Sequence, residues 1–287
     1  MIATYAVLAL AVLALWLPGA GWRRHAWLLL FAASLVAALL TGVVAPVGLV
    51  AVGGLAVAAW LFSRPEAGRA QRVISGLALV GLATVLMLHR AEGFNNPRVI
   101  DAVRFTPDAL PFTLYLNFDK TLVGLFILGW CHARLTRAGE WRAMLAALAP
   151  RAGALIALIM VLSLAMGYVR FAPKLPAETL LWLGVNLLFT CMAEEALFRG
   201  FVQAQLQRAW QNVLGGSWLA LGVAAVLFGL AHAAGGAAYV ALATVAGLGY
   251  GWIYRHTRSI EASILAHFTL NTVHFLAFTY PALAAGR

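Results

Sequence analysis

The sequence predicts an all-α protein, a polytopic transmembrane helix bundle of eight to ten spans. Of its 287 residues, 63% are apolar and only 10% are charged, and the mean hydropathy is +0.88. Soluble globular domains contain about 25% charged residues, so this composition is typical of a membrane protein. Most charged residues also lie between apolar runs rather than within them. The lipid bilayer is therefore the first partner we expect.

Ten apolar runs approach the length of about 20 residues that a helix needs to cross a bilayer. Their approximate limits are Ile2 to Leu17, Ala26 to Ala45, Val47 to Phe62, Val73 to His89, Phe112 to Cys131, Ala154 to Val169, Leu180 to Ala204, Gly216 to Ala234, Ala237 to Tyr254 and Ile260 to Tyr280. Only Pro46 separates the second run from the third, so these two form either two spans or one broken hairpin.

The basic residues predict the orientation of the spans. No basic residue precedes the first apolar run, and Arg23 and Arg24 follow it, which favours a retained anchor with an outward N-terminus over a cleaved signal peptide. With this orientation the following arginines face the inside: Arg64, Arg69, Arg72, Arg134, Arg137, Arg142, Arg151, Arg208, Arg255 and Arg258. Arg170 and Lys174 are the exceptions. Compact loops without eukaryotic targeting signals favour a prokaryotic inner membrane.

Charge and cysteine content exclude two other classes. The formal charge of +10 can indicate nucleic-acid binding, but the arginines are dispersed singly and in pairs between apolar runs, as expected of loops that face anionic lipid headgroups. We therefore expect no nucleic-acid partner. The two cysteines, Cys131 and Cys191, support neither a disulfide framework nor a cysteine metal site.

Two adjacent glutamates, Glu194 and Glu195, lie deep in the seventh apolar run. An ionisable residue inside a span costs about 2.5 to 3.5 kcal/mol on insertion scales, so such residues usually mark a functional site. On a helix, Glu195 and Arg199 are i,i+4 neighbours and can form an ion pair. Glu194 points about 100° away from that pair and is available for another task.

Further polar residues occur in two later runs. The eighth contains Phe228 and His232 at i,i+4 spacing. The tenth contains His267 and Asn271 at the same spacing, followed by His274 on the same helix face. Because these polar groups concentrate in the second half, we expect residues 1–150 to be accessory helices and residues 151–287 to be the functional core.

Each feature also has a structural interpretation. Histidine and asparagine side chains can hold membrane helices together by hydrogen bonds, and Glu195 with Arg199 can be a structural ion pair. Asn117, Asp119 and Lys120 are expected to cap the fifth span at the outer surface. The joint occurrence of the buried polar groups favours a functional site.

Three motifs resemble the signature of the CPBP (CAAX protease and bacteriocin-processing, or Abi) intramembrane endopeptidases. In chain order they are Glu194-Glu195-x-x-x-Arg199, Phe228-x-x-x-His232 and His267-x-x-x-Asn271. The resemblance covers about residues 150 to 287. It implies hydrolysis of a peptide bond in a membrane-associated protein or peptide by a glutamate-activated water, without a cofactor.

The resemblance also implies a role for each residue. Glu194 would be the general base, and His232 would hold and polarise the water. Glu195 and Arg199 would form a supporting pair, while His267 and Asn271 would donate hydrogen bonds to the developing oxyanion.

Two alternatives stay open. Glu194, His232 and His267 could instead ligate zinc and leave a fourth position for water, although the sequence contains no His-Glu-x-x-His motif. A transporter, or a non-catalytic bacteriocin-immunity protein on the same fold, would also place carboxylates and histidines inside the membrane. A proton carrier, however, would not need the His267 and Asn271 pair.

Overall fold

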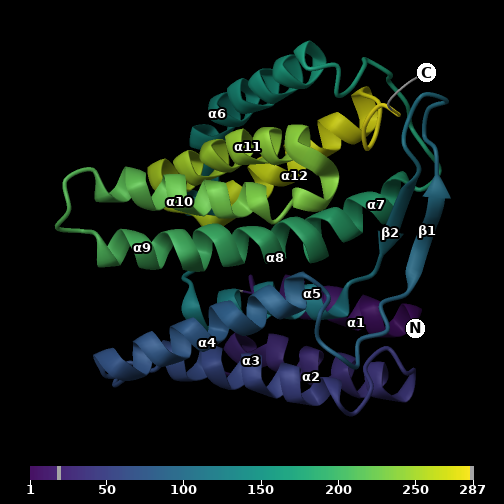
Figure 1. Cartoon of the computed structure of the whole chain (residues 1–287). Coiled ribbons are helices and arrows are strands. Elements are labelled where there is room, and N and C mark those ends of the chain that lie inside the picture. Colours follow the sequence, from purple (N-terminus) through teal and green to yellow (C-terminus); the bar gives the residue numbers. More distant parts are fainter. Residues whose placement is uncertain (18–20, 285–287) are drawn as a thin grey trace. The chain divides into compact units, whose positions relative to one another are not determined.

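The computed structural model describes residues 1–17 and 21–284 and is mostly helical (Figure 1). The prediction that the chain is mainly helical is confirmed. The chain divides into two compact units. The first unit comprises residues 1–97, 116–138 and 188–201, and the second comprises residues 98–115, 139–187 and 202–287.

The predicted count of eight to ten spans is not confirmed. Among the described residues, four helical stretches are long and apolar enough to cross a membrane: Arg69–Met87, Ala138–Ala165, Thr179–Ala209 and Ala233–Thr257. Four shorter apolar helices accompany them: Ile2–Ala14, Ala26–Leu40, Gly48–Ser63 and Gly216–Leu230. At about 1.5 Å per residue, helices of this length are shorter than the hydrocarbon core of about 30 Å.

The first unit is built from short helical pairs around one buried helix. Its elements are α1 (Ile2–Ala14), a 3₁₀ turn (Gly21–His25), α2 (Ala26–Leu40), α3 (Gly48–Ser63), α4 (Arg69–Met87) and α5 (Phe118–Phe126), which continues as a π-helical turn (Ile127–Cys131). Helix α1 packs against α2, and α3 packs against α4. Every residue of α5 except Lys120 is buried, so α5 is the core of this unit.

The turn between α2 and α3 lies where the sequence predicts a break at Pro46. The Ala45 amide donates to the Gly93 carbonyl at 2.8 Å, and the Asn95 amide donates to the Val43 carbonyl at 2.8 Å. Gly93 has a φ of +85°, and a Cβ at this position would lie 2.5 Å from the Gly48 amide nitrogen. The two apolar runs are therefore separate helices joined by a turn. The loop at Gly93 packs against this turn so closely that residue 93 must be glycine.

A long helical stretch, Thr179–Ala209, carries the two glutamates (Figure 1). It consists of α7 (Thr179–Val185), a π-helical segment (Asn186–Cys191), α8 (Met192–Glu195), a second π-helical segment (Ala196–Gln203) and α9 (Ala204–Ala209). Helical stretches with π turns are rare and frequently mark functional sites. The short α8 segment thus lies between two irregular segments.

Helices α5 and α8 pack closely in the first unit because Gly124 has no side chain. A Cβ at Gly124 would clash with the Met192 sulfur and would lie 2.7 Å from the Ala193 Cα. Glycine at this position therefore allows the α5 backbone to approach the turn of helix that carries Glu194.

The second unit contains a two-stranded antiparallel hairpin and four longer helices. Besides α7 and α9, its elements are β1 (Arg98–Val103), β2 (Phe112–Tyr115), α6 (Ala138–Ala165, of which Ala138 is assigned to the first unit), α10 (Gly216–Leu230), a 3₁₀ turn (Ala233–Gly235), α11 (Gly236–Thr257) and α12 (Ile260–Ala277). Neither strand is predicted from the sequence, and β2 lies at the start of the apolar run from Phe112 to Cys131. Helix α11 packs against both α10 and α12 (Figure 1). Phe228 of the second motif lies on α10, His232 follows the end of α10, and the third motif lies on α12.

Candidate functional site

Both glutamates are buried in the first unit. Glu194 is 6% exposed and Glu195 is fully buried. Burying an ionised carboxylate is costly unless it is paired and hydrogen-bonded. The partners of these two residues therefore define the site in this unit.

Glu195 forms the predicted ion pair with Arg199. The guanidinium Nη1 lies 2.9 Å from the Glu195 Oε1, and both side chains are fully buried. The spacing of four residues keeps the two groups on one side of the helix although the intervening turn is π-helical. A pair this deeply buried fixes the helix locally, because loss of either partner would leave a charge in an apolar environment.

Glu194 is paired with Lys120, for which the sequence predicts only a capping role. The Lys120 Nζ lies 2.5 Å from the Glu194 Oε1, and the two side chains are 14% and 7% exposed. No local pattern relates two residues that are 74 positions apart. One sequence signal was present: Lys120 is one of only two lysines in a chain whose other basic residues are arginines and histidines.

A polar cluster at the start of α5 fixes the position of Lys120. The Asp119 side chain is buried, with its Oδ2 2.8 Å from the His89 Nδ1, and its Oδ1 accepts from the Asn96 amide at 2.8 Å. The same Oδ1 accepts from the Lys120 backbone amide at 2.8 Å. Asn117 occupies the N-cap position, as the sequence predicts, but its side chain makes no capping hydrogen bond. The Asn96 Oδ1 accepts from the Phe118 amide instead.

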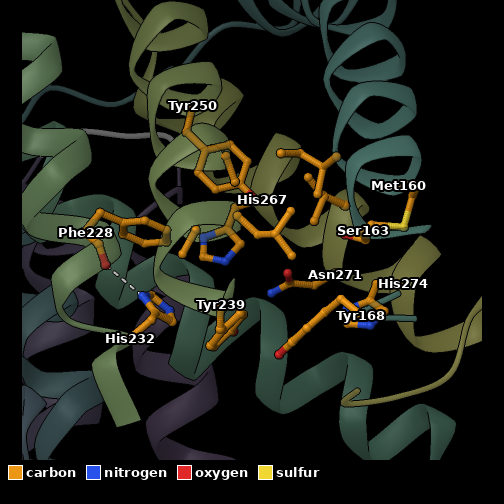
Figure 2. Close-up of a pocket in the computed structure, with 15 residues that line it drawn as sticks. Met160, Ser163, Tyr168, Phe228, His232, Tyr239, Tyr250, His267, Asn271 and His274 are labelled. Atoms are coloured by element: carbon orange, nitrogen blue, oxygen red, sulfur yellow. Dashed lines mark hydrogen bonds between the residues drawn. The ribbon is translucent and has the colours of Figure 1, made fainter. Parts of the chain in front are cut away.

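The second unit brings His232, His267 and Asn271 to one pocket (Figure 2). The His232 Nδ1 lies 2.7 Å from the Phe228 carbonyl oxygen. Because a carbonyl only accepts, Nδ1 must carry the proton, and in the neutral ring Nε2 then presents a lone pair. Phe228 thus sets the tautomer of His232 through its backbone, and its ring packs beside the imidazole, with ring centroids 4.6 Å apart.

His267 is held between aromatic rings. Its imidazole stacks on Tyr250, with ring centroids 4.7 Å apart and an interplanar angle of 18°. It also meets the Phe228 ring edge-on, with centroids 5.6 Å apart. With an exposed fraction of 5%, His267 has little freedom to change orientation. Figure 2 shows Tyr250 and Phe228 flanking this imidazole.

Asn271 and His274 line the same pocket, one turn further along α12. The Asn271 Nδ2 donates to the Asn186 Oδ1 at 3.4 Å, and Asn186 is the first residue of the π-helical segment after α7. The His274 Nε2 lies 3.2 Å from the Thr279 carbonyl, and its ring packs against Tyr280. His274 therefore anchors the end of α12, in agreement with its structural interpretation.

Two tyrosines of this pocket were not identified from the sequence. Tyr168 and Tyr239 stack with ring centroids 6.0 Å apart, and Tyr239 meets the His232 ring edge-on at 5.2 Å. Both point toward the space beside His232 and Asn271 (Figure 2). Neither lies within a motif, so only the folded chain relates them to the site. The cavity has a volume of about 60 Å³, which accommodates a few water molecules but not a lipid chain.

The structure groups the six predicted site residues in two sets. Glu194, Glu195 and Arg199 lie in the first unit, and His232, His267 and Asn271 lie in the second. Within either unit, the described residues include no group of three His, Cys, Asp or Glu side chains placed to share a metal ion. The first set consists of buried charges, and the second consists of imidazole and amide groups around a small cavity.

Residues 176–273 match the family model described as type II CAAX prenyl endopeptidase Rce1-like. The matched segment begins just before α7, ends within α12 and contains all three motifs. This match confirms the resemblance to the CPBP and CAAX protease family. The family is a peptidase family, and together with the apolar helices it indicates an integral membrane protein. Searches of curated proteins and of solved structures found no match.

The buried ion pair generates a stability prediction. Arg199→Met leaves Glu195 as a buried, uncompensated charge and should destabilise the protein by about 3 to 5 kcal/mol. The matched control is Arg64→Met, which breaks an Arg64–Glu66 pair whose side chains are 42% and 70% exposed. That change should cost less than about 1 kcal/mol. Thermal unfolding of the detergent-purified variants measures both effects, and equal midpoints for the two variants would contradict the structural role of Arg199.

Proposed function

We propose that the protein is an intramembrane endopeptidase that hydrolyses a peptide bond of a membrane-associated protein or peptide with a glutamate-activated water. One observation carries the proposal: the segment that matches the peptidase family contains the three motifs, and the structure gathers His232, His267 and Asn271 around one small cavity. Imidazole and amide groups can orient a water molecule and donate hydrogen bonds to an oxyanion, which supports the proposal.

In this proposal Glu194 is the general base. Its carboxylate removes a proton from water as the water oxygen attacks the carbonyl carbon of the substrate, and the proton is then delivered to the leaving amine nitrogen. The ion pair with Lys120 is made through the carboxylate oxygen Oε1. Lys120 stabilises the ionised form of Glu194, which is the form that a base needs. Glu195 with Arg199 holds this turn of the helix in place.

His232 positions the water. With its Nδ1 proton directed to the Phe228 carbonyl, its Nε2 accepts a hydrogen bond from the water. This bond orients the water lone pair toward the substrate carbonyl. Tyr239 packs against the imidazole and restricts its rotation.

His267 and Asn271 stabilise the oxyanion of the tetrahedral intermediate. An asparagine amide has two N–H donors, so the bond from Asn271 to Asn186 occupies one and orients the other. The stacking of His267 on Tyr250 fixes the direction of its ring donors. Fixed donors of this kind contribute about 2.7 to 4 kcal/mol each to stabilisation of the transition state.

The family match and the composition support our proposals for the substrate class and the membrane. The matched family is named for CAAX prenyl endopeptidases, and we propose peptide hydrolysis of membrane-associated substrates without requiring a prenyl chain. We place the protein in a prokaryotic inner membrane. Residues 151–287 carry the catalytic groups and residues 1–150 are accessory, with Lys120 as the contribution of the accessory half to the site.

Replacing Glu194 or Asn271 tests the proposed chemistry. Glu194→Gln removes the base without a change in shape and should abolish cleavage, while Asn271→Ala removes an oxyanion donor and should lower turnover about 10²- to 10³-fold. The measurement is a comparison of peptide termini in membrane fractions from cells that carry each variant. Both variants should remain folded, but Glu194→Gln should unfold at a lower temperature than the wild type, because Lys120 loses its carboxylate partner. Any phenotype that persists in both does not arise from proteolysis, and would point to the transport or immunity alternative.

Lys120 provides a second test. Lys120→Met should lower the turnover number more than it changes KM, because substrate binding is retained while the base loses its counter-charge. Lys120→Arg keeps the positive charge and should recover part of the activity. Lys174→Met is the matched control, since Lys174 is the other lysine of the chain and lies outside the three motifs. Full activity of Lys120→Met would exclude a role for the ion pair.

Metal removal decides between the two mechanisms. With Glu194 as base and no metal, activity should survive exhaustive chelation, and the purified protein should contain no stoichiometric zinc. If Glu194, His232 and His267 instead bind zinc, chelation should abolish activity and added zinc should restore it. Elemental analysis of the purified protein, combined with the chelation assay, distinguishes the two results.

A further inference from the structure

A second cavity lies in the second unit, away from the motif residues. It has a volume of about 460 Å³ and is lined by Gln207, Ser217, Tyr254, Arg255 and Arg258. The lining residues thus supply two guanidinium groups, two hydroxyl groups and an amide, and none of the five is acidic. The nearby Glu261 is 3% exposed and accepts a hydrogen bond from the Ser259 hydroxyl at 2.7 Å. The cavity therefore has the chemistry of an anion site.

Arg255 is already oriented for binding. Its Nε donates to the Ser217 hydroxyl at 3.1 Å, and its guanidinium carbon lies 4.3 Å from the centroid of the Trp218 ring. These two contacts hold the planar group in one position, so less conformational entropy is lost when a ligand binds. Because the contact to Ser217 uses Nε, the two Nη atoms are the fork suited to bidentate contact with a phosphate.

Helix geometry adds two further features. Ser217 lies in the first turn of α10, a helix of 15 residues, and the N-terminus of a helix favours a nearby anion. Arg258 is the C-cap residue of α11, with a left-handed backbone at φ +54°, and its amide donates to the Tyr254 carbonyl at 2.8 Å. This cap turns the chain so that a second guanidinium lines the same cavity as Arg255.

The surface beside the cavity is apolar and exposed. Val213, Leu214, Trp218 and Leu219 lie just before α10 or in its first turn, and each has more than half of its surface exposed. In a membrane protein such a surface contacts acyl chains, and tryptophan is enriched at the level of the lipid headgroups. The arginines of this region belong to the loops expected on the inner side, where the leaflet surface is negatively charged.

We propose that this cavity binds the phosphate headgroup of an anionic membrane phospholipid, with the acyl chains along the exposed apolar residues at the start of α10. The site has a counterpart for each part of the lipid. Arg255 and Arg258 bind the phosphate headgroup, and the exposed apolar residues at the start of α10 contact the acyl chains. A free phosphate ion would satisfy the first part only. The site does not depend on peptidase activity.

Lipid binding to the purified wild-type protein gives the first measurement. Phosphatidylglycerol and phosphatidylcholine are each titrated into detergent-solubilised protein, and bound lipid is detected by native mass spectrometry and by the unfolding temperature. We expect phosphatidylglycerol to bind and raise the unfolding temperature, and phosphatidylcholine to do neither at the same concentration. Equal binding of the two lipids would overturn the proposal. So would an equal rise in unfolding temperature with inorganic phosphate at the lipid concentration, because the ligand would then be a free anion.

Paired variants locate the site. Arg255→Gln with Arg258→Asn removes both charges, and asparagine tolerates the left-handed backbone at residue 258. Affinity for phosphatidylglycerol should fall about tenfold or more. Arg69→Gln with Arg72→Gln makes the same charge change at the start of α4 and should retain wild-type affinity. An undiminished affinity in the first variant, or an equal loss in the second, would show that diffuse surface charge binds the lipid and would overturn the proposal.

Discussion

The need to neutralise two adjacent buried carboxylates is the constraint on which the site depends. Glu195 meets it within its own helix through Arg199, and Glu194 meets it through Lys120 on α5. These solutions differ in kind. The first is a local pair that stabilises one turn of helix, whereas the second joins two segments far apart in the chain. Helix α5 must therefore be buried and close to α8, and Gly124 permits that approach.

In the second unit, the polar side chains of the motifs are held in fixed orientations by hydrogen bonds and ring contacts rather than by ion pairs. His232 is oriented by a backbone carbonyl, and His267 is oriented by stacked aromatic rings. Such preorganisation is what the proposed contacts with a water molecule and a developing oxyanion require. The small cavity beside them admits water-sized molecules.

Local spacing allowed much of the site to be predicted from the sequence. The i,i+4 rule gave the pair of Glu195 with Arg199 and the common helix face of His267 and Asn271, because both depend only on helix geometry. Lys120 could not be assigned to Glu194, since no periodic pattern spans 74 residues. The number of spans was not confirmed, because hydropathy marks apolar runs but does not fix where their helices begin and end.

The origin of the oxygen in a cleaved product tests the central claim most directly. A membrane peptide whose terminus depends on Glu194 is incubated with purified protein in ¹⁸O-labelled water, and the new carboxyl terminus is analysed by mass spectrometry. Hydrolysis by a water that Glu194 activates predicts one ¹⁸O atom in that carboxylate with the wild-type protein and no product with Glu194→Gln. A labelled product formed equally by Glu194→Gln would contradict the account.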